Sequence, residues 1–258
     1  MHPILFKLGP LTIHTYGLAI ALAFLSGTAL STNLAKREGE NPQLLYDLIF
    51  YLMLAAIIGS RLLYVLINYK YYLDDPLRAV KIWEGGLVFY GGLLAAAGTG
   101  IWFMRRHQMP TWPTADLLAP GIALGQAIGR IGCLMAGCCY GRPTDAFWGI
   151  TFADPNCLAP VGISLHPTQI YSSLESLIIF GILMWLGKYR SFKGQIFCSY
   201  IALYSVTRFI IEFFRGDERG GIAIETWVLS TSQIIAILTL AGAGFMYWRL
   251  SRLSSSRR

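Results

Sequence analysis

The residues best suited to chemistry in this sequence are three arginines that stand inside long apolar stretches. Arg130 lies in GQAIGRIGCLMAGCCYGR at 125–142, Arg61 in IIGSRLLYVLINY, and Arg208 in SVTRFIIEFFRG. An arginine inside a membrane costs roughly 2.5–3.5 kcal/mol on insertion scales and typically marks a functional site. Its planar guanidinium group offers two parallel donors and stays charged, which suits phosphate. The sequence therefore predicts an intramembrane anion site, most simply for a lipid phosphate, with Arg130 in it.

Pairing with an acid is the structural alternative for each arginine. Glu212 follows Arg208 by four residues, which places both on one helix face. Arg130 has no acid within two helical turns on its own segment. Asp116 is fourteen residues away, or about 21 Å along a helix. A purely structural role in an ion pair is therefore the weakest explanation for Arg130.

The composition indicates a membrane protein. Of 258 residues, 55% are hydrophobic and only 14% are charged, whereas a soluble domain carries about 25% charged residues. The net charge of +7 does not indicate nucleic acid, because the basic residues lie between apolar stretches and not on one face or tail. We therefore expect one all-α integral-membrane domain over residues 1–258.

Seven apolar stretches approach the length of about 20 residues that a membrane-spanning helix needs. They cover residues 16–34, 45–68, 87–104, 117–137, 167–186, 195–214 and 229–250. Lys and Arg are more frequent in the loops that face the cytoplasm if the N-terminus is outside. The sequence thus predicts about seven transmembrane helices, an external N-terminus, a cytoplasmic C-terminus and an irregular extracytoplasmic loop at 140–166.

Further polar residues fall at the outer ends of these predicted spans. His14 and Tyr16 precede the first span, and His166 and Gln169 open the fifth. Tyr90 lies in WEGGLVFYGGLL between two glycine pairs, which permit either close helix packing or a break in the helix. By the predicted topology, the three arginines lie in the outer halves of their spans, at the level of the two histidines. This shared depth favours a common site.

The cysteines do not predict a metal site or a disulfide framework. Their number is odd, and they form no CxxC pair; they are Cys133, Cys138, Cys139, Cys157 and Cys198. The adjacent pair at 138–139 is poor zinc-ligand spacing. We therefore expect neither metal nor cofactor and interpret the cysteines as small, buried-type residues. A disulfide from the pair to Cys157 is the alternative if that loop lies outside the cytoplasm.

An ordered set of motifs gives the chain a family resemblance. They are HTYG at 14–17, GSRLLY at 59–64, GGLVFYGG at 85–92, ADLLAP at 115–120, GRIG at 129–132, HPTQIY at 166–171 and RFIIEFFR at 208–215. GRIG alone is a weak signal, but the ordered set over nearly the whole chain is specific. The sequence resembles the bacterial prolipoprotein diacylglyceryl transferases.

The resemblance implies a reaction, its partners and a location. The family moves the diacylglyceryl group of phosphatidylglycerol onto the lipobox cysteine of preprolipoproteins, forming a thioether and releasing glycerol phosphate. This implies phosphatidylglycerol, lipobox signal peptides and the bilayer as partners, no nucleic acid, and the bacterial cytoplasmic (inner) membrane as location. With the arginine argument, it implies catalytic residues Arg130, Arg208, His14, Tyr16, Glu212 and Tyr90 and lipid-binding residues Arg130, Arg208, Arg61 and Gly141.

Two departures from the family pattern affect the expected mechanism. The family segment often reads GRxGNFxNGExxG, where this chain has Cys133, Ala136 and Cys138. Tyr90 stands where the family usually has His. If that His is the general base, this chain needs another, because tyrosine has a reference pKa of about 10. His14 ranks first, with His166 and Glu212 as alternatives.

Two other function classes compete with this interpretation. A proton-coupled transporter would use Asp116, Glu175 and Glu212 as a proton relay. The sequence shows no internal repeat and sets its arginines at one depth, and both features argue against a transporter. Asp116 alternatively serves as a helix N-terminal acid favoured by the helix dipole. A purely structural membrane subunit leaves the three arginines unexplained.

Overall fold

The computed structural model describes residues 2–8, 11–73, 75–82, 85–216, 221–224 and 227–255. The chain is mostly helical, at 72%, which agrees with the predicted all-α class. It divides into two compact units. The larger unit comprises Met1–Ser31 and Ala115–Arg258, and the smaller comprises Thr32–Thr114. A single integral-membrane domain over residues 1–258 stays a prediction.

Each stretch predicted as a membrane span coincides with one long helix. These helices are α1 (Thr15–Arg37), α2 (Pro42–Ile67), α4 (Phe89–Arg106), α5 (Thr111–Ala136), α6 (Thr168–Lys188), α7 (Gln195–Glu212) and α8 (Thr231–Ser255). Helix α5 begins earlier than its apolar stretch, because the polar turn before residue 117 is also helical. Hydrophobicity alone therefore located the helices but missed this boundary.

Five helices in the described ranges are long and apolar enough to cross a membrane: α1, α2, α5, α6 and α8. Their outward surfaces are apolar, and Leu25, Ile58 and Ile178 are each more than 60% exposed. Apolar surface on this scale suits lipid and not water. The fold is therefore that of a multi-pass membrane protein, while the number of seven spans and the orientation stay predictions.

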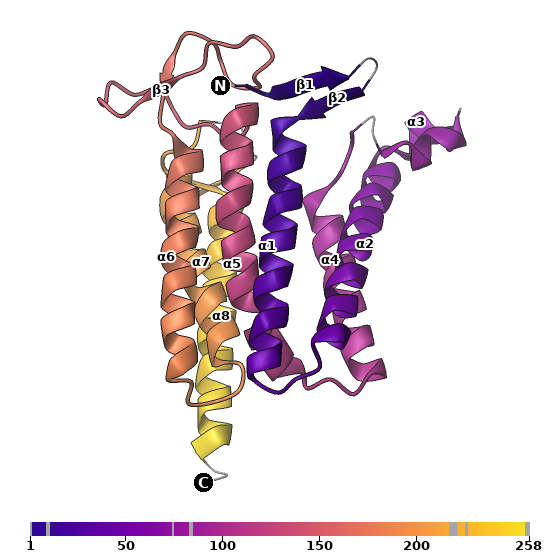
Figure 1. Cartoon of the computed structure of the whole chain (residues 1–258). Coiled ribbons are helices and arrows are strands. Elements are labelled where there is room, and N and C mark those ends of the chain that lie inside the picture. Colours follow the sequence, from indigo (N-terminus) through magenta and orange to yellow (C-terminus); the bar gives the residue numbers. More distant parts are fainter. Residues whose placement is uncertain are drawn as a thin grey trace. The chain divides into compact units, whose positions relative to one another are not determined.

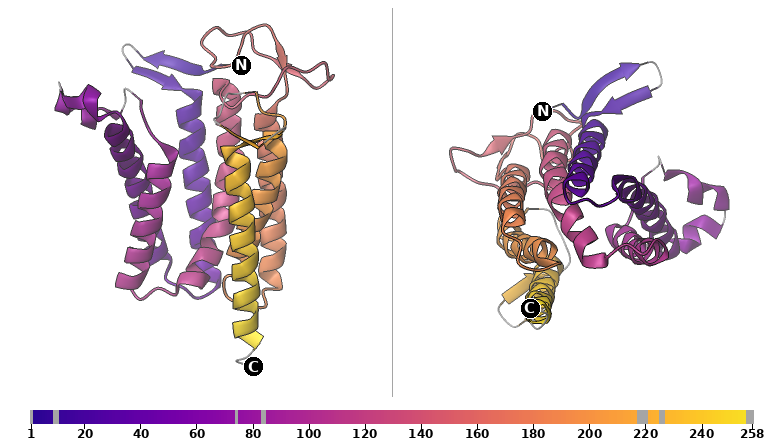
Figure 2. Two further views of the ribbon diagram at one scale, coloured as in Figure 1. Left: turned by 180° about the vertical axis from the view of Figure 1, so that it is seen from behind. Right: turned by 60° about the horizontal axis from the view of Figure 1, so that its bottom comes forward.

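In the larger unit, α5 to α8 and most of α1 run alongside one another (Figures 1 and 2). The buried core is formed by Ala119 and Ala123 of α5, Ile179 and Leu183 of α6, and Ile196 and Tyr200 of α7. Helix α1 crosses α5 at Gly27 and Gly121. A Cβ added at either glycine would lie 2.6–2.7 Å from the carbonyl oxygen of the other. This crossing therefore requires glycine on both helices.

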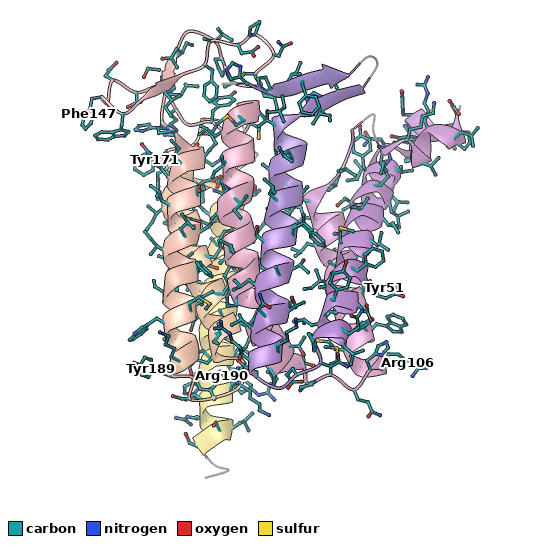
Figure 3. All side chains as sticks on the ribbon, in the orientation of Figure 1. Tyr51, Arg106, Phe147, Tyr171, Tyr189 and Arg190 are labelled. Carbon is teal, nitrogen blue, oxygen red and sulfur yellow. The ribbon has the colours of Figure 1, made fainter. Side chains whose placement is uncertain are left out.

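One end of the larger unit carries its strands, and we call it the hairpin end (Figure 1). The antiparallel pairs are β1 (Ile4–Leu8) with β2 (Leu11–His14), β3 (Ile150–Thr151) with β4 (Ser164–Leu165), and β5 (Gly221–Ile224) with β6 (Trp227–Ser230). The predicted 140–166 loop lies between α5 and α6 and has a small core of Phe152, Ala159 and Leu165. Figure 3 places Tyr171 toward the hairpin end of α6 and Tyr189 and Arg190 beyond its other end.

The smaller unit is built on the packing of α2 against α4. Short helices α3 (Tyr69–Leu73) and η1 (Pro76–Val80) join them. The two glycine pairs around Tyr90 take different roles. Gly85 and Gly86 have positive φ angles of 85° and 78° and form the turn before α4. Gly92 packs on α2, where an added Cβ would lie 2.8 Å from the Ala56 carbonyl oxygen. The first pair thus interrupts the helix, and the second permits close packing.

Candidate active site

Arg130 lies half-buried on α5, six residues before this helix ends at the hairpin end. Among the described residues, its guanidinium group makes no hydrogen bond and no ion pair. The titratable groups with the strongest electrostatic interaction with Arg130 are Tyr204, Cys133, Cys139 and Arg215. None of these four is a carboxylate. Arg130 is therefore a helix-borne cation without an ion-pair partner in the described structure, which is the property an anion site needs.

Arg208 differs, because it has a carboxylate partner. Its Nη2 lies 2.7 Å from Oε2 of Glu212 and 3.1 Å from the hydroxyl oxygen of Ser232 on α8. The predicted pairing between residues four apart on α7 is therefore confirmed. The pair is largely buried, so its Coulomb attraction is weakly screened.

Glu175 on α6 lies near both of these arginines. Its carboxylate is within electrostatic range of Arg130 and Arg208 and contacts the hydroxyl group of Thr207. Its Oε2 is buried without a hydrogen-bond partner among the described residues. Sequence reasoning placed Glu175 only in a transporter relay. It missed this position, because nothing in the local sequence relates Glu175 to residues on α5 and α7.

His14 and Tyr16 stand at the hairpin end of α1. His14 is exposed and ends strand β2, directly before the helix begins at Thr15. Tyr16 packs on α5, where its ring lies 3.4 Å from a Cβ added at Gly132. Its hydroxyl group lies within electrostatic range of Arg130 and of the thiols of Cys133, Cys138 and Cys139. The structure thus places Tyr16 against the part of α5 that carries Arg130, two residues from Gly132.

Gly141 fixes the loop that joins α5 to α6. Its backbone N–H donates to the carbonyl oxygen of His166 at 3.1 Å, and it forms an isolated β-bridge with Arg215. An added Cβ would lie 2.8 Å from the Phe214 carbonyl oxygen and closer still to His166. His166 in turn lies 3.2 Å from the Tyr171 hydroxyl oxygen through Nδ1. Gly141 is therefore required by close backbone packing between the ends of α6 and α7.

Arg61 and Tyr90 belong to the smaller unit. Arg61 is buried, and all three guanidinium nitrogens donate to backbone carbonyl oxygens; the acceptors are Arg78, Ala79, Lys81, Gly85 and Gly86. This arginine therefore holds the segment between α3 and α4 in place, a role that sequence reasoning missed. Tyr90 is about half exposed at the start of α4. The expected part of both residues in lipid binding or catalysis stays a prediction.

Asp116 has a structural role at the opposite end of the larger unit. Its carboxylate accepts hydrogen bonds from the backbone N–H groups of Gly194 at 2.7 Å and Phe197 at 2.9 Å. Arg190 lies 3.8 Å away. The interpretation of Asp116 as a helix N-terminal acid therefore holds, but the helix that it caps is α7 and not its own α5.

Three cysteines cluster where α5 ends. The sulfur atoms of Cys133, Cys138 and Cys139 all lie within 4.8 Å of one another and could together hold a metal ion. All five cysteines are free thiols, so the alternative disulfide to Cys157 is not formed. Hydrogen bonds with Cys133 and Cys138, and the charge of Arg215, lower the pKa of the Cys139 thiol. Hydrogen bonds with the other two thiols raise the pKa of Cys138.

Comparisons with known proteins agree on one family. The family model described as prolipoprotein diacylglyceryl transferase matches residues 3–249. A phosphatidylglycerol–prolipoprotein diacylglyceryl transferase of Clostridium tetani is 36% identical over 96% of this chain and 97% of its own length. Similar enzymes from Clostridium perfringens and Trichormus variabilis are 34% and 37% identical, over 100% and 96% of this chain and 98% and 90% of their lengths.

Two findings leave the transporter alternative without support. Of its three relay acids, Asp116 caps α7 and Glu212 pairs with Arg208. The family and the named relatives are transferases. Residues 3–249, nearly the whole sequence, match the family, and the motifs that carry the resemblance include those that contain Tyr16, Arg130 and Arg208. The chain therefore belongs to the prolipoprotein diacylglyceryl transferase family.

Proposed function

We propose that this protein transfers the diacylglyceryl group of phosphatidylglycerol to the thiol of the lipobox cysteine in preprolipoproteins. The reaction is the first step of lipoprotein maturation, and the names of the relatives support it. The thiolate sulfur attacks the phosphate-bearing carbon of the diacylglycerol part of the lipid. A carbon–sulfur bond forms, the carbon–oxygen bond to phosphate breaks, and glycerol phosphate leaves with the bonding electrons.

The observation that carries this proposal is the state of Arg130. Its guanidinium group has no ion-pair partner among the described residues, while Arg208 is paired and Arg61 is saturated by carbonyl oxygens. A phosphate diester would form the direct ion pair that Arg130 lacks among these residues. We place this phosphate on Arg130, with Arg208 as the second cation. Together they would stabilise the charge that grows on the leaving oxygen in a site of low dielectric.

The reaction also needs a base, because the thiolate and not the thiol is the nucleophile. We propose His14 for this role. It is exposed at the hairpin end, two residues before Tyr16, whereas His166 contacts the Tyr171 hydroxyl group and Glu212 pairs with Arg208. Tyr90 is a poorer candidate, because a tyrosine hydroxyl group must lose its own proton before it can act as a base.

The location and orientation follow from the same proposal. Phosphatidylglycerol and signal peptides meet in the bacterial cytoplasmic membrane, where a multi-pass protein would act. We propose seven spans, with the N-terminus and the hairpin end outside and the C-terminus in the cytoplasm. This orientation is supported by the basic residues beyond the opposite end, among them Lys188 and Arg190.

A purified system tests the proposal directly. The protein in detergent is given phosphatidylglycerol and a peptide with a lipobox cysteine, and the diacylglyceryl thioether is followed by mass spectrometry. We expect product from the parent, none from Arg130→Ala, and normal product from Arg249→Ala, whose side chain is exposed on α8. Near-normal rates in a folded Arg130→Ala variant would refute the phosphate site. No product from a folded, lipid-binding parent would refute the reaction.

A further inference from the structure

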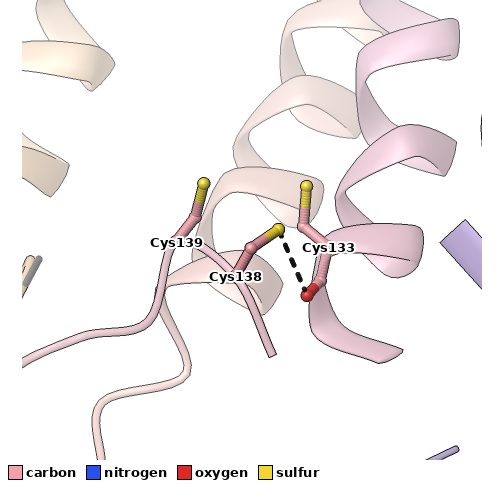
Figure 4. A group of neighbouring side chains, drawn as sticks. All are labelled: Cys133, Cys138 and Cys139. Carbon is pink, nitrogen blue, oxygen red and sulfur yellow. Dashed lines mark hydrogen bonds between the residues drawn. The ribbon is translucent and has the colours of Figure 1, made fainter. Parts of the chain in front are cut away.

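The cysteine cluster at the end of α5 has the geometry of a metal site. Cys133 lies on the last turn of the helix, and Cys138 and Cys139 follow Gly137 (Figure 4). Their sulfur atoms lie within 4.8 Å of one another. Three thiolates bound to one zinc ion at about 2.3 Å would be separated by about 3.8–4.0 Å. Only small movements would therefore bring all three sulfurs onto one ion.

The backbone holds this arrangement in place without any metal. Gly137 and Cys139 have positive φ angles of 72° and 58°, which turn the chain back toward Cys133. The N–H of Cys138 donates to the carbonyl oxygen of Cys133 at 3.1 Å. A positive φ is uncommon for a residue other than glycine, and such positions are found where the surrounding structure enforces them. The turn is thus specifically built.

Two buried side chains from α6 complete the support. Thr168 donates from its hydroxyl group to the carbonyl oxygen of Cys139 at 2.7 Å, and Gln169 donates from Nε2 to that of Cys138 at 2.8 Å. Both residues are only 1% exposed. The cluster is therefore held by α5 and by α6. Metal ligands are usually held in place by hydrogen bonds from such neighbouring residues.

Charge and ligand chemistry select the kind of ion. Thiolates favour soft or borderline cations such as zinc, cadmium and copper(I), and not magnesium or calcium. Three thiolates around a divalent ion leave one net negative charge. The guanidinium group of Arg215 is buried close enough to Cys139 for its positive charge to act on this thiol. A divalent ion also leaves less residual negative charge on three thiolates than a monovalent ion does.

We propose that Cys133, Cys138 and Cys139 bind one thiophilic divalent cation of the zinc group through three thiolates, with the three thiol protons released to solvent. The site goes beyond the transferase activity, and its binding is measured without any transfer reaction. The ion would tie the end of α5 to the loop that leads to α6. A disulfide between two of the same thiols is the competing outcome.

Cadmium is the probe, because its thiolate complexes absorb in the ultraviolet. The full chain, reduced and stripped with a chelator, is titrated with Cd²⁺ in detergent. We expect one Cd²⁺ ion per chain, competition for the same site by excess Zn²⁺, and loss of binding by about 100-fold or more in Cys133→Ser, Cys138→Ser or Cys139→Ser. Cys157→Ser and Cys198→Ser are matched controls and should bind as the parent does.

A second measurement uses the unmodified protein, so that a misfolded variant cannot hide the result. Maleimide labelling with and without Zn²⁺ is read by peptide mass spectrometry. We expect Zn²⁺ to protect the three clustered cysteines and to leave Cys157 as reactive as before. Absence of protection and of Cd²⁺ absorption would overturn the site. Two blocked thiols with a mass lower by two hydrogens and no bound metal would show the disulfide instead and equally refute it.

Discussion

Residue by residue, the three arginines on the long apolar helices differ in which groups contact their charge. Arg61 donates to backbone carbonyl oxygens, Arg208 pairs with Glu212, and Arg130 has neither kind of partner in the described structure. Identical side chains in similar apolar sequences therefore perform different tasks. The distinction decides which substitution should affect chemistry and which should affect stability.

The Arg208–Glu212 pair gives a prediction that separates these two effects. Glu212→Leu removes the carboxylate that lies 2.7 Å from Arg208, and losing one partner of a buried pair costs about 3–5 kcal/mol. We expect the melting temperature in detergent to fall clearly. The double variant Arg208→Met with Glu212→Leu should regain most of that loss, because both charges are gone, yet it should transfer no lipid. A Glu212→Leu variant as stable as the parent would contradict this account.

At the scale of elements, glycine determines how closely α1 and α5 pack. Gly121→Val would drive a Cβ to 2.6 Å from the Gly27 carbonyl oxygen, and overpacking of this kind costs about 1–3 kcal/mol. We expect a lower melting temperature. Gly181→Ala on α6 is the matched control: no atom lies within 4 Å of its added Cβ, and it should be neutral or stabilising by about 0.5–1 kcal/mol. Equal effects of both variants would disprove the close crossing.

The cap that α5 provides to α7 makes a further prediction. Asp116→Ala removes the acceptor of two backbone N–H groups, and each buried donor left without a partner costs about 1–3 kcal/mol. Thermal unfolding should show the loss, whereas the exposed Asp145→Ala should not change it. The folded fraction of Asp116→Ala should still form the thioether. Loss of transfer with unchanged stability would give Asp116 a chemical role instead.

The same elements show what sequence reasoning can and cannot reach. Long apolar stretches located the seven long helices of the described ranges, since that signal lies within each segment, and spacing alone identified the Arg208–Glu212 pair. The contacts of Asp116, Arg61 and Glu175 were missed, because each joins residues far apart in the chain. The cysteine cluster was missed for another reason. The three sulfur atoms come together at a turn in which Gly137 and Cys139 both have positive φ angles, and residue spacing in the sequence does not reveal such a turn.

For the whole molecule, the orientation in the membrane is the property that reporters can measure. A fluorescent protein fused after Arg258 should fluoresce if the C-terminus is cytoplasmic. Alkaline phosphatase fused within the loop after Asn156 should be active, because it folds only outside. The basic residues beyond the far ends of the helices give the physical reason. The reverse pattern of activities would invert the proposed topology, and it would also place the hairpin end away from the signal peptides.

The cap at Asp116 also has a consequence for biosynthesis. The backbone groups that satisfy this carboxylate lie 78 and 81 residues further along the chain. At about 5–20 residues per second, a ribosome needs roughly 4–16 s to make that intervening segment. During this interval Asp116 lacks the two backbone donors that satisfy it in the final structure. In the orientation proposed above, this end of α5 faces the cytoplasm, so we expect water to solvate the carboxylate until α7 is made and docks on it.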